Sequence, residues 1–224
     1  MSSRLPEGLT RRPLTRANAA AAAALFDDDE VFRGARPRLE AGDALDWWLR
    51  ADLAHDSWLF EDDGRPVAVG WVQEHDAIGL SSGCVHPAAK GRGIGSHLVG
   101  LAENCARDKS CRRLRQLAPG ADDAARALFE SRGYRDRRHY FEMAIDLDEQ
   151  TVEPELPTGY AIESFRTADA QAYHAAATDA FAEDEGVNLP PVDTGNPTGA
   201  LGLYERAGMH VAAEYVSFER ELDR

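Results

Sequence analysis

The chain has 224 residues, of which 43% are hydrophobic and 29% are charged, a balance typical of one or two globular domains. Its formal net charge of −14 argues against a nucleic-acid partner, because a phosphate-binding surface needs a basic stripe. The longest apolar run near the start, residues 19–26, is far shorter than the roughly 20 residues that cross a bilayer, and it lacks the features of a signal peptide. We therefore expect a cytoplasmic protein that binds neither nucleic acid nor a membrane.

The first part of the chain reads as alternating strands and helices. The predicted elements, in chain order, are a strand over 9–14, a helix from Thr15 to about 26, a loop over 27–30, a helix over 43–52, strands over 57–61 and 67–73, and a strand over 78–85. Asp63 and Gly64 are turn residues that join two of these strands as a hairpin, and Trp47 and Trp48 are expected in the core. Pro87 cannot donate to a sheet ladder, so strand pairing should end before it.

The chain continues with the same alternation. The predicted elements are a helix over 94–108, a strand over 113–117, a helix over 122–131, and two strands within 134–147 joined by a turn near Arg137. Gly133 marks the end of the second helix. The fold class predicted from this order is mixed α/β.

The three cysteines are Cys84, Cys105 and Cys111. They lack the paired spacing of a zinc site and lie in segments that look structured, so we expect free thiols and no metal.

The end of the chain repeats part of its beginning. Residues 8–18 match 159–169 at an offset of 151 positions (159 minus 8), and 128–134 match 203–209 at an offset of 75 (203 minus 128). The second copy therefore lacks about 76 interior residues (151 minus 75). The predicted organisation is a domain over 1–150, a Pro-containing linker over 151–158 and a partial repeat over 159–224.

Gly91, Gly93 and Gly95 alternate where a predicted strand passes into a predicted helix. Glycine lets the backbone turn sharply and approach a ligand closely. The first N–H groups of the following helix have no helical partner and lie at the positive end of its dipole, which suits a diphosphate. Lys90 and Arg92 would add positive charge. A tight turn that binds no ligand is the structural alternative.

The segment 84–95 resembles the signature of the GNAT acetyltransferases, in which Arg or Gln is followed by two residues, Gly, one residue, and Gly or Ala. Lys90 stands at the Arg or Gln position. The resemblance covers about residues 8–147 and implies a mixed central sheet flanked by helices, with acetyl-CoA as co-substrate. It also implies that Val85 ends a splayed strand that holds the pantetheine and the acetyl carbonyl, and that residues 90–96 hold the diphosphate. The cofactor-binding residues implied are Cys84, Val85, His86, Lys90, Gly91, Arg92, Gly93, Ile94, Gly95 and Ser96.

The duplicated arrangement resembles tandem GNAT proteins of the mycothiol-synthase type, chiefly through residues 196–209. The incomplete second copy could fold as a lobe, exchange with another chain or stay loose. An exposed strand edge would favour a homodimer.

The resemblance implies that the acceptor amine attacks the thioester directly and that a tyrosine in the last helix protonates the leaving thiolate. Phe129 stands at that position in the first copy and cannot donate a proton, whereas Tyr204 stands there in the second copy. Tyr134 is a second candidate acid and Glu74 a candidate base. A packing role for the tyrosines and a solvated surface role for the glutamate are the alternatives. Cys84 invites an acyl-cysteine mechanism, but a buried thiol is the simpler interpretation.

These observations predict an N-acetyltransferase that moves the acetyl group of acetyl-CoA to the amine of a small molecule. An acetyl-CoA-binding or scaffold protein without catalytic activity is the alternative, because of Phe129, Lys90 and the shortened repeat. A nucleotide site in a doubly wound fold fits less well, because no acidic residue ends a strand about 20 residues beyond the glycines.

Overall fold

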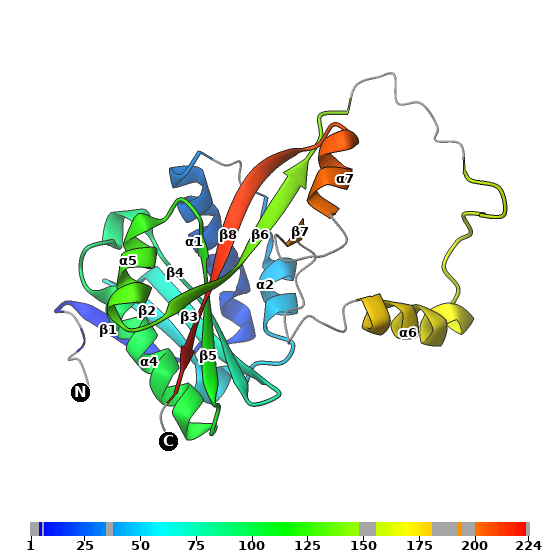
Figure 1. The fold of residues 1–224 in the computed structure, drawn as a ribbon. Helices are drawn as coiled ribbons and strands as arrows, with labels where there is room; N and C mark the ends of the chain where they lie inside the picture. Colours follow the sequence, from blue (N-terminus) through cyan, green and yellow to red (C-terminus); the bar gives the residue numbers. More distant parts are fainter. Residues whose placement is uncertain are drawn as a thin grey trace.

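The computed structural model describes residues 5, 7–34, 38–147, 156–180, 192–193 and 200–222 (Figure 1). The strands are β1 (Leu9–Arg12), β2 (Ser57–Asp62), β3 (Arg65–His75), β4 (Ile78–Val85), β5 (Arg113–Pro119), β6 (Arg135–Ala144), β7 (Val192–Asp193) and β8 (His210–Glu221). The α-helices are α1 (Ala19–Phe32), α2 (Ala41–Trp47), α3 (Leu53–Asp56), α4 (Ile94–Asp108), α5 (Asp123–Ser131), α6 (Ala170–Ala180) and α7 (Ala200–Arg206). Short 3₁₀ turns are η1 (Arg16–Asn18), η2 (Pro87–Ala89) and η3 (Thr167–Asp169).

The described strands form one mixed sheet in the order β1-β2-β3-β4-β5-β8-β6-β7. Its strands pair antiparallel except β4 and β5, which run parallel. This confirms the predicted mixed α/β class. The hairpin of β2 and β3 is also confirmed, with Asp63 (φ 49°) and Gly64 (φ 76°) in the turn. The strand predicted over 78–85 and the helix predicted over 94–108 have the expected bounds.

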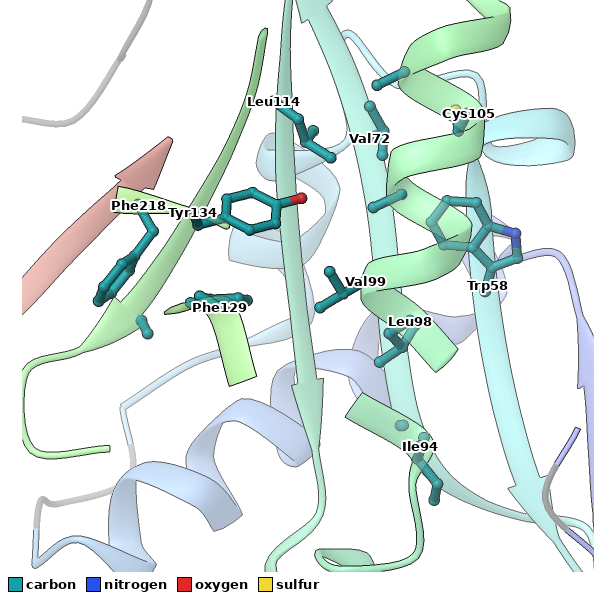
Figure 2. Close-up of a cluster of buried hydrophobic side chains, with 14 of the residues drawn as sticks. Trp58, Val72, Ile94, Leu98, Val99, Cys105, Leu114, Phe129, Tyr134 and Phe218 are labelled. Carbon is teal, nitrogen blue, oxygen red and sulfur yellow. The ribbon is translucent and has the colours of Figure 1, made fainter. Parts of the chain in front are cut away.

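Neighbouring residues of the central strands face two different layers, as the alternation of side chains along a strand requires. Leu59 and Val69 pack with α1 and α2 on one face of the sheet. Phe60 and Ala68 belong to the cluster on the other face, which includes α4 and α5 (Figure 2). The sheet is therefore buried on both sides.

The tryptophans of the second helix lie in the core, as predicted. Trp48 is 3% exposed, and the ring of Trp47 stacks on that of Trp71 with centroids 6.0 Å apart. The helix itself is shorter than expected and ends at Trp47.

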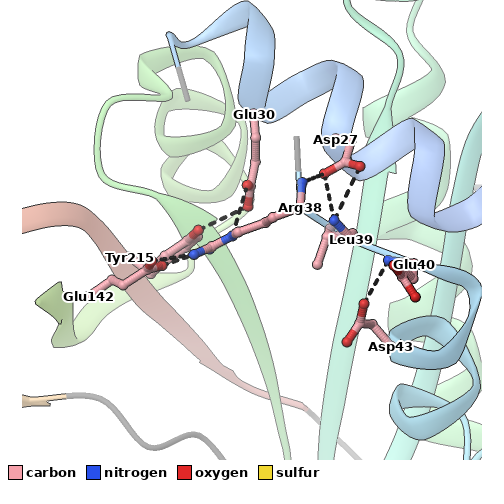
Figure 3. A network of polar contacts seen from close by, with 8 residues as sticks. All are labelled: Asp27, Glu30, Arg38, Leu39, Glu40, Asp43, Glu142 and Tyr215. Atoms are coloured by element: carbon pink, nitrogen blue, oxygen red, sulfur yellow. Dashed lines mark hydrogen bonds and ion pairs between the residues drawn. The ribbon is translucent and has the colours of Figure 1, made fainter. Parts of the chain in front are cut away.

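The acidic run 27–30 is helical, and the prediction of a loop there is wrong. Asp27 accepts hydrogen bonds from the backbone N–H groups of Arg38 (3.0 Å) and Leu39 (3.1 Å) (Figure 3). Glu30 accepts one from the Tyr215 hydroxyl at 3.1 Å. These carboxylates extend α1 because each has a partner in a distant segment.

β6 is one continuous strand, and the prediction of two strands within 134–147 is wrong. Its partner is β8, which is distant in sequence, and the ladder shifts register between Asp136 and Arg138. The irregularity near Arg137 is therefore a bulge and not a turn.

The last strand, β8, lies between β5 and β6 in the same sheet. It pairs with β5 from Arg113↔Glu221 to Pro119↔Tyr215, and Val216 is fully buried. The segment predicted as a partial repeat thus contributes a strand to the sheet built by the first part of the chain. The linker predicted over 151–158 lies mostly outside the described residues.

Candidate functional site

The parallel strands β4 and β5 separate before they end. Their ladder runs from Ile78↔Arg113 to Ser81↔Gln116 and goes no further, although β4 continues to Val85. Each strand stays paired on its outer side, β4 with β3 and β5 with β8. The backbone edges that face each other beyond this point are therefore splayed apart.

A cavity of about 390 Å³ lies at this separation. Its apolar lining includes Trp58, Val85, Ile94, Leu98, Val99, Leu128 and Phe129. Its polar lining includes Asp29, Ser81, Ser82, Lys90, Ser96, Gln116 and Asp122. The site is thus a mostly apolar cleft with polar groups at a few positions, as is typical of small-molecule sites.

The glycine-rich loop borders the cavity where α4 begins. Gly91 and Gly93 both have φ of +80°, a conformation that favours glycine. A Cβ on either residue would meet no atom within 4 Å, so glycine is needed for the backbone angle and not for space. Gly93, Ile94, Gly95 and Ser96 all line the cavity. The free N–H groups of the first turn of α4 therefore border a cleft, a suitable place for an anion.

Lys90 links two walls of the cavity. Its Nζ lies 2.9 Å from Asp29 Oδ1 in α1 and 3.2 Å from Asp122 Oδ2 at the start of α5. Burial alone would lower the pKa of Lys90, but the two carboxylates raise it above its usual value. Burial alone would raise the pKa of Asp122, but the Ala125 N–H and Lys90 lower it. The lysine is therefore charged, and an entering anion would have to share it with two carboxylates.

Seven of the ten residues expected to bind the cofactor line the cavity, and Cys84, His86 and Arg92 do not. The Cys84 thiol lies on the opposite face of the sheet and donates to the Leu25 carbonyl at 3.3 Å. Burial raises the pKa of Cys84, so the group is a thiol and not a nucleophilic thiolate.

His86 and Arg92 have local partners outside the cavity. The Nδ1 of His86 accepts the Ala88 N–H at 3.1 Å and so caps η2. Arg92 pairs with Asp62 at the end of β2, 2.5 Å away. Their binding of a cofactor stays a prediction.

Of the three candidate catalytic residues, only Tyr134 lies near the cavity. It is 2% exposed and packs on Phe129, which lines the cavity, with ring centroids 5.6 Å apart. Glu74 is exposed and pairs with Gly79, toward the end of β4 opposite to Val85. Tyr204 lies in α7, beyond the far end of the ribbon formed by β6 and β8 (Figure 1). The catalytic roles expected of these three residues stay predictions.

Sequence reasoning missed Asp29, Gln116 and Asp122 as lining residues. Gln116 lies between Leu114 and Ala118 in a strand whose alternate residues face the core. A polar side chain among the core-facing apolar residues of this strand is a signal, detectable in the sequence, that the residue lines a site. Asp29 carried no signal, because its place in the cavity depends on α1 packing against distant parts of the sheet.

The described part of the chain holds no helix with the length and apolar character needed to cross a membrane. Within the same residues, no group of three or more His, Cys, Asp and Glu side chains could hold a metal ion.

Comparison with known proteins places this geometry in context. The model of the acetyltransferase (GNAT) family matches residues 21–134. A GCN5-related N-acetyltransferase from Sphaerobacter thermophilus is 22% identical, with a TM-score of 0.82 over 99% of this chain and 98% of that one. The protein yncA of Salmonella typhimurium, whose structure contains its cofactor acetyl-CoA, is 14% identical, with a TM-score of 0.54 over 97% of this chain and 96% of that one. The ribosomal-protein-S18-alanine N-acetyltransferase of Escherichia coli is 13% identical, with a TM-score of 0.53 over 96% and 95%. A search of curated proteins returned no significant match.

Proposed function

The chain belongs to the acetyltransferase (GNAT) family and is an acyltransferase, and we propose that it transfers the acetyl group of acetyl-CoA to the amine of a small molecule. The observation that carries the proposal is the separation of β4 from β5 beyond Ser81 and Gln116, next to the open first turn of α4. An elongated ligand with an anionic middle fits this combination.

In the proposed complex, the diphosphate lies at the N–H groups of residues 93–96 and the pantetheine lies between the splayed strand ends. Both regions line the same cavity. The similarity in fold to yncA, whose structure contains its cofactor acetyl-CoA, supports this placement.

The proposed reaction is a direct attack of the amine on the thioester. The nitrogen forms a bond to the carbonyl carbon and gives up one proton to water or a base, the C–S bond breaks, and the sulfur takes the electron pair and a proton. By resemblance, the backbone N–H at Val85 would donate to the carbonyl oxygen as charge develops there. Phe129 cannot supply the proton, so the thiolate would be protonated by water or by another group.

The test is thiol release from acetyl-CoA across a panel of small amines, with a peptide that begins in alanine as the comparison. Turnover above background with a small amine supports the proposal. Turnover with the peptide alone would overturn the small-molecule assignment. Tight binding of acetyl-CoA without turnover for any acceptor would favour the non-catalytic alternative.

We also propose that residues 159–224 are a shortened second copy of the fold, and local structure at the predicted offsets supports this. Near the start of each copy, a 3₁₀ turn leads into a helix: η1 into α1 and η3 into α6. The turn closes in the same way, with Asn18 N–H donating to the Thr15 carbonyl (2.9 Å) and Asp169 N–H donating to the Arg166 carbonyl (2.8 Å).

The ends of the two copies agree equally well. The Tyr134 N–H donates to the Phe129 carbonyl at 3.0 Å, and 75 positions later the Met209 N–H donates to the Tyr204 carbonyl at 3.0 Å. A glycine with positive φ precedes each of these donors, with φ of 82° and 87°. Each helix end then leads into a strand, β6 or β8.

We further propose a homodimer, because the second copy leaves large apolar side chains uncovered. Tyr160 is 74% exposed and Phe165 is 66% exposed, whereas the residues 151 positions earlier, Leu9 and Leu14, are 7% and 2% exposed. Light scattering on the purified chain tests this proposal. A monomer mass at all concentrations up to the millimolar range would overturn it.

A further inference from the structure

The floor of the cavity carries a buried side chain amide that the proposed reaction does not use. Gln116 lies in the last pair that β5 forms with β4, opposite Ser81. Its side chain lines the cavity, and the residue is only 6% exposed. Its Nε2 is buried and finds no hydrogen-bond acceptor among the described residues.

Tyr134 is a neighbour of this amide. Its ring lies beside β5, between Leu114 and Phe129 (Figure 2). Burial raises the pKa of Tyr134, and the adjacent Gln116 side chain partly opposes this effect. The effect of Gln116 on this pKa is that of a side-chain hydrogen bond, although among the described residues neither Gln116 Nε2 nor the Tyr134 hydroxyl has a partner that meets the distance and angle of a normal hydrogen bond.

Two buried polar groups that have at best a poorly formed hydrogen bond with each other are costly in a core, since both gave up water to be there. The same stripe of β5 is otherwise apolar, with Leu114 and Ala118 on either side of Gln116. Packing alone would be satisfied by another leucine at 116. A ligand that brings an acceptor to the cavity floor would satisfy the amide.

We propose that Gln116 Nε2 donates a hydrogen bond to a carbonyl oxygen of the pantetheine-thioester arm of acetyl-CoA, with Tyr134 as a positioning residue that orients the Gln116 side chain. The inference rests on the proposed function. If the diphosphate lies at residues 93–96, the arm runs toward the point where β4 and β5 meet, and this is where Gln116 lies. The arm carries amide and thioester carbonyl oxygens and so supplies acceptors along its length. Gln116 changes neither charge nor protonation in this role.

The experiment is calorimetric titration of the full chain and its Gln116→Leu variant with acetyl-CoA, coenzyme A and adenosine 3′,5′-bisphosphate. We expect acetyl-CoA to bind about tenfold more weakly to the variant, because the complex loses one hydrogen bond to a buried side chain. The bisphosphate lacks the arm, so its affinity should not change. If only acetyl-CoA loses affinity, the thioester oxygen is the acceptor of the Gln116 hydrogen bond. If coenzyme A loses affinity equally, the acceptor is an amide oxygen of the pantetheine.

Two controls separate this role from a structural one. Gln171→Leu makes the same chemical change on the exposed helix α6 and should leave all three affinities unchanged. Tyr134→Phe alone should weaken the binding of acetyl-CoA about threefold. In the double variant it should cause no further loss of affinity beyond that of Gln116→Leu, because a positioning residue acts only through the group it orients. If Gln116→Leu does not fold, Gln116→Met replaces it, since methionine adapts to irregular spaces.

The outcomes distinguish the two proposals. If the unmodified chain does not bind acetyl-CoA, the proposed function fails and this inference fails with it. If the chain binds acetyl-CoA and Gln116→Leu binds it equally well, only this inference is overturned, and a buried water is then the partner of the amide.

Discussion

Tyr140 of β6 and Tyr215 of β8 are direct partners in the antiparallel ladder, and they are 75 positions apart (215 minus 140), the same offset that relates α5 to α7. An antiparallel pair has a local two-fold axis, and here the axis passes between two residues at equivalent positions of the proposed copies. The helices that precede these strands, α5 before β6 and α7 before β8, therefore lie at opposite ends of the β6–β8 ribbon (Figure 1). In the proposed duplication, the two copies would therefore meet through their last strands.

Gly93→Asp should abolish acetyl-CoA binding, with an affinity loss of about 100-fold or more, because it places a carboxylate where the diphosphate is proposed to lie. Titration calorimetry measures the loss. Gly64→Asp is the matched control: Gly64 has φ of +76° and open space around it, so it carries the same backbone strain outside the cavity. Equal affinities for the two variants would refute the anion site.

Lys90→Met should weaken acetyl-CoA about tenfold or more, because it leaves Asp29 and Asp122 without their shared cation beside an incoming anion. Lys109→Met is the control, since Lys109 also pairs with a buried carboxylate, Asp56, at 2.7 Å. It lies beyond the C-terminal end of α4 and should change stability without changing affinity. A similar loss of affinity in both variants would contradict a specific role for Lys90.

Glu103→Gln should lower the free energy of unfolding by about 3 kcal/mol, because a buried carboxylate with arginine partners is replaced by a neutral amide. Glu103 is 5% exposed and accepts hydrogen bonds from Arg132 (2.8 and 3.0 Å) and Arg220 (3.1 Å). These contacts tie α4 to the end of α5 and to β8. Urea unfolding provides the measurement, with the exposed Glu130→Gln as control. A change under about 1 kcal/mol would show that the cluster is solvated.

His139 should make stability depend on pH near neutrality. Hydrogen bonding to Glu214, and to a lesser extent Asp136, raises the pKa of His139 above 6.5. A raised pKa in the folded state stabilises the protein fully below pH 6.5, and this contribution is lost as the pH rises through the folded value. Because the site is partly exposed, the effect should stay under about 1 kcal/mol. Urea unfolding between pH 5 and pH 9, in about six steps, should show a decline that His139→Gln removes; an unchanged decline in the variant would assign it to other groups.

Local patterns carried much of the prediction. The bounds of β4 and α4 followed from Pro87 after the strand, from apolar spacing at 94, 98, 102 and 105, and from glycine at the junction. These signals act over one or two turns of chain, where sequence alone decides the backbone.

Long-range pairing was the part that sequence could not give. β6 was expected to fold back on itself near Arg137, but its partner lies about 75 positions later, and no local signal marks a strand that pairs so far away. The prediction of a loop at the acidic run of α1 failed for the same reason, because Asp27 and Glu30 find their partners in segments beyond the helix. The polar lining at Asp29 became visible only once α1 was placed beside the cavity, whereas Gln116 carried a local signal as a polar residue in an apolar stripe of β5.

The position of β8 bears on how the sheet is completed during folding. Its residues come after those of β5 and β6 in sequence, yet they fill a gap between these two strands in the middle of the sheet. Until β8 has inserted, the folding chain would expose the facing edges of β5 and β6. A chain cut before β8 should accordingly aggregate and not behave as a slightly shortened protein, which makes this strand as consequential for solubility as the cleft is for binding.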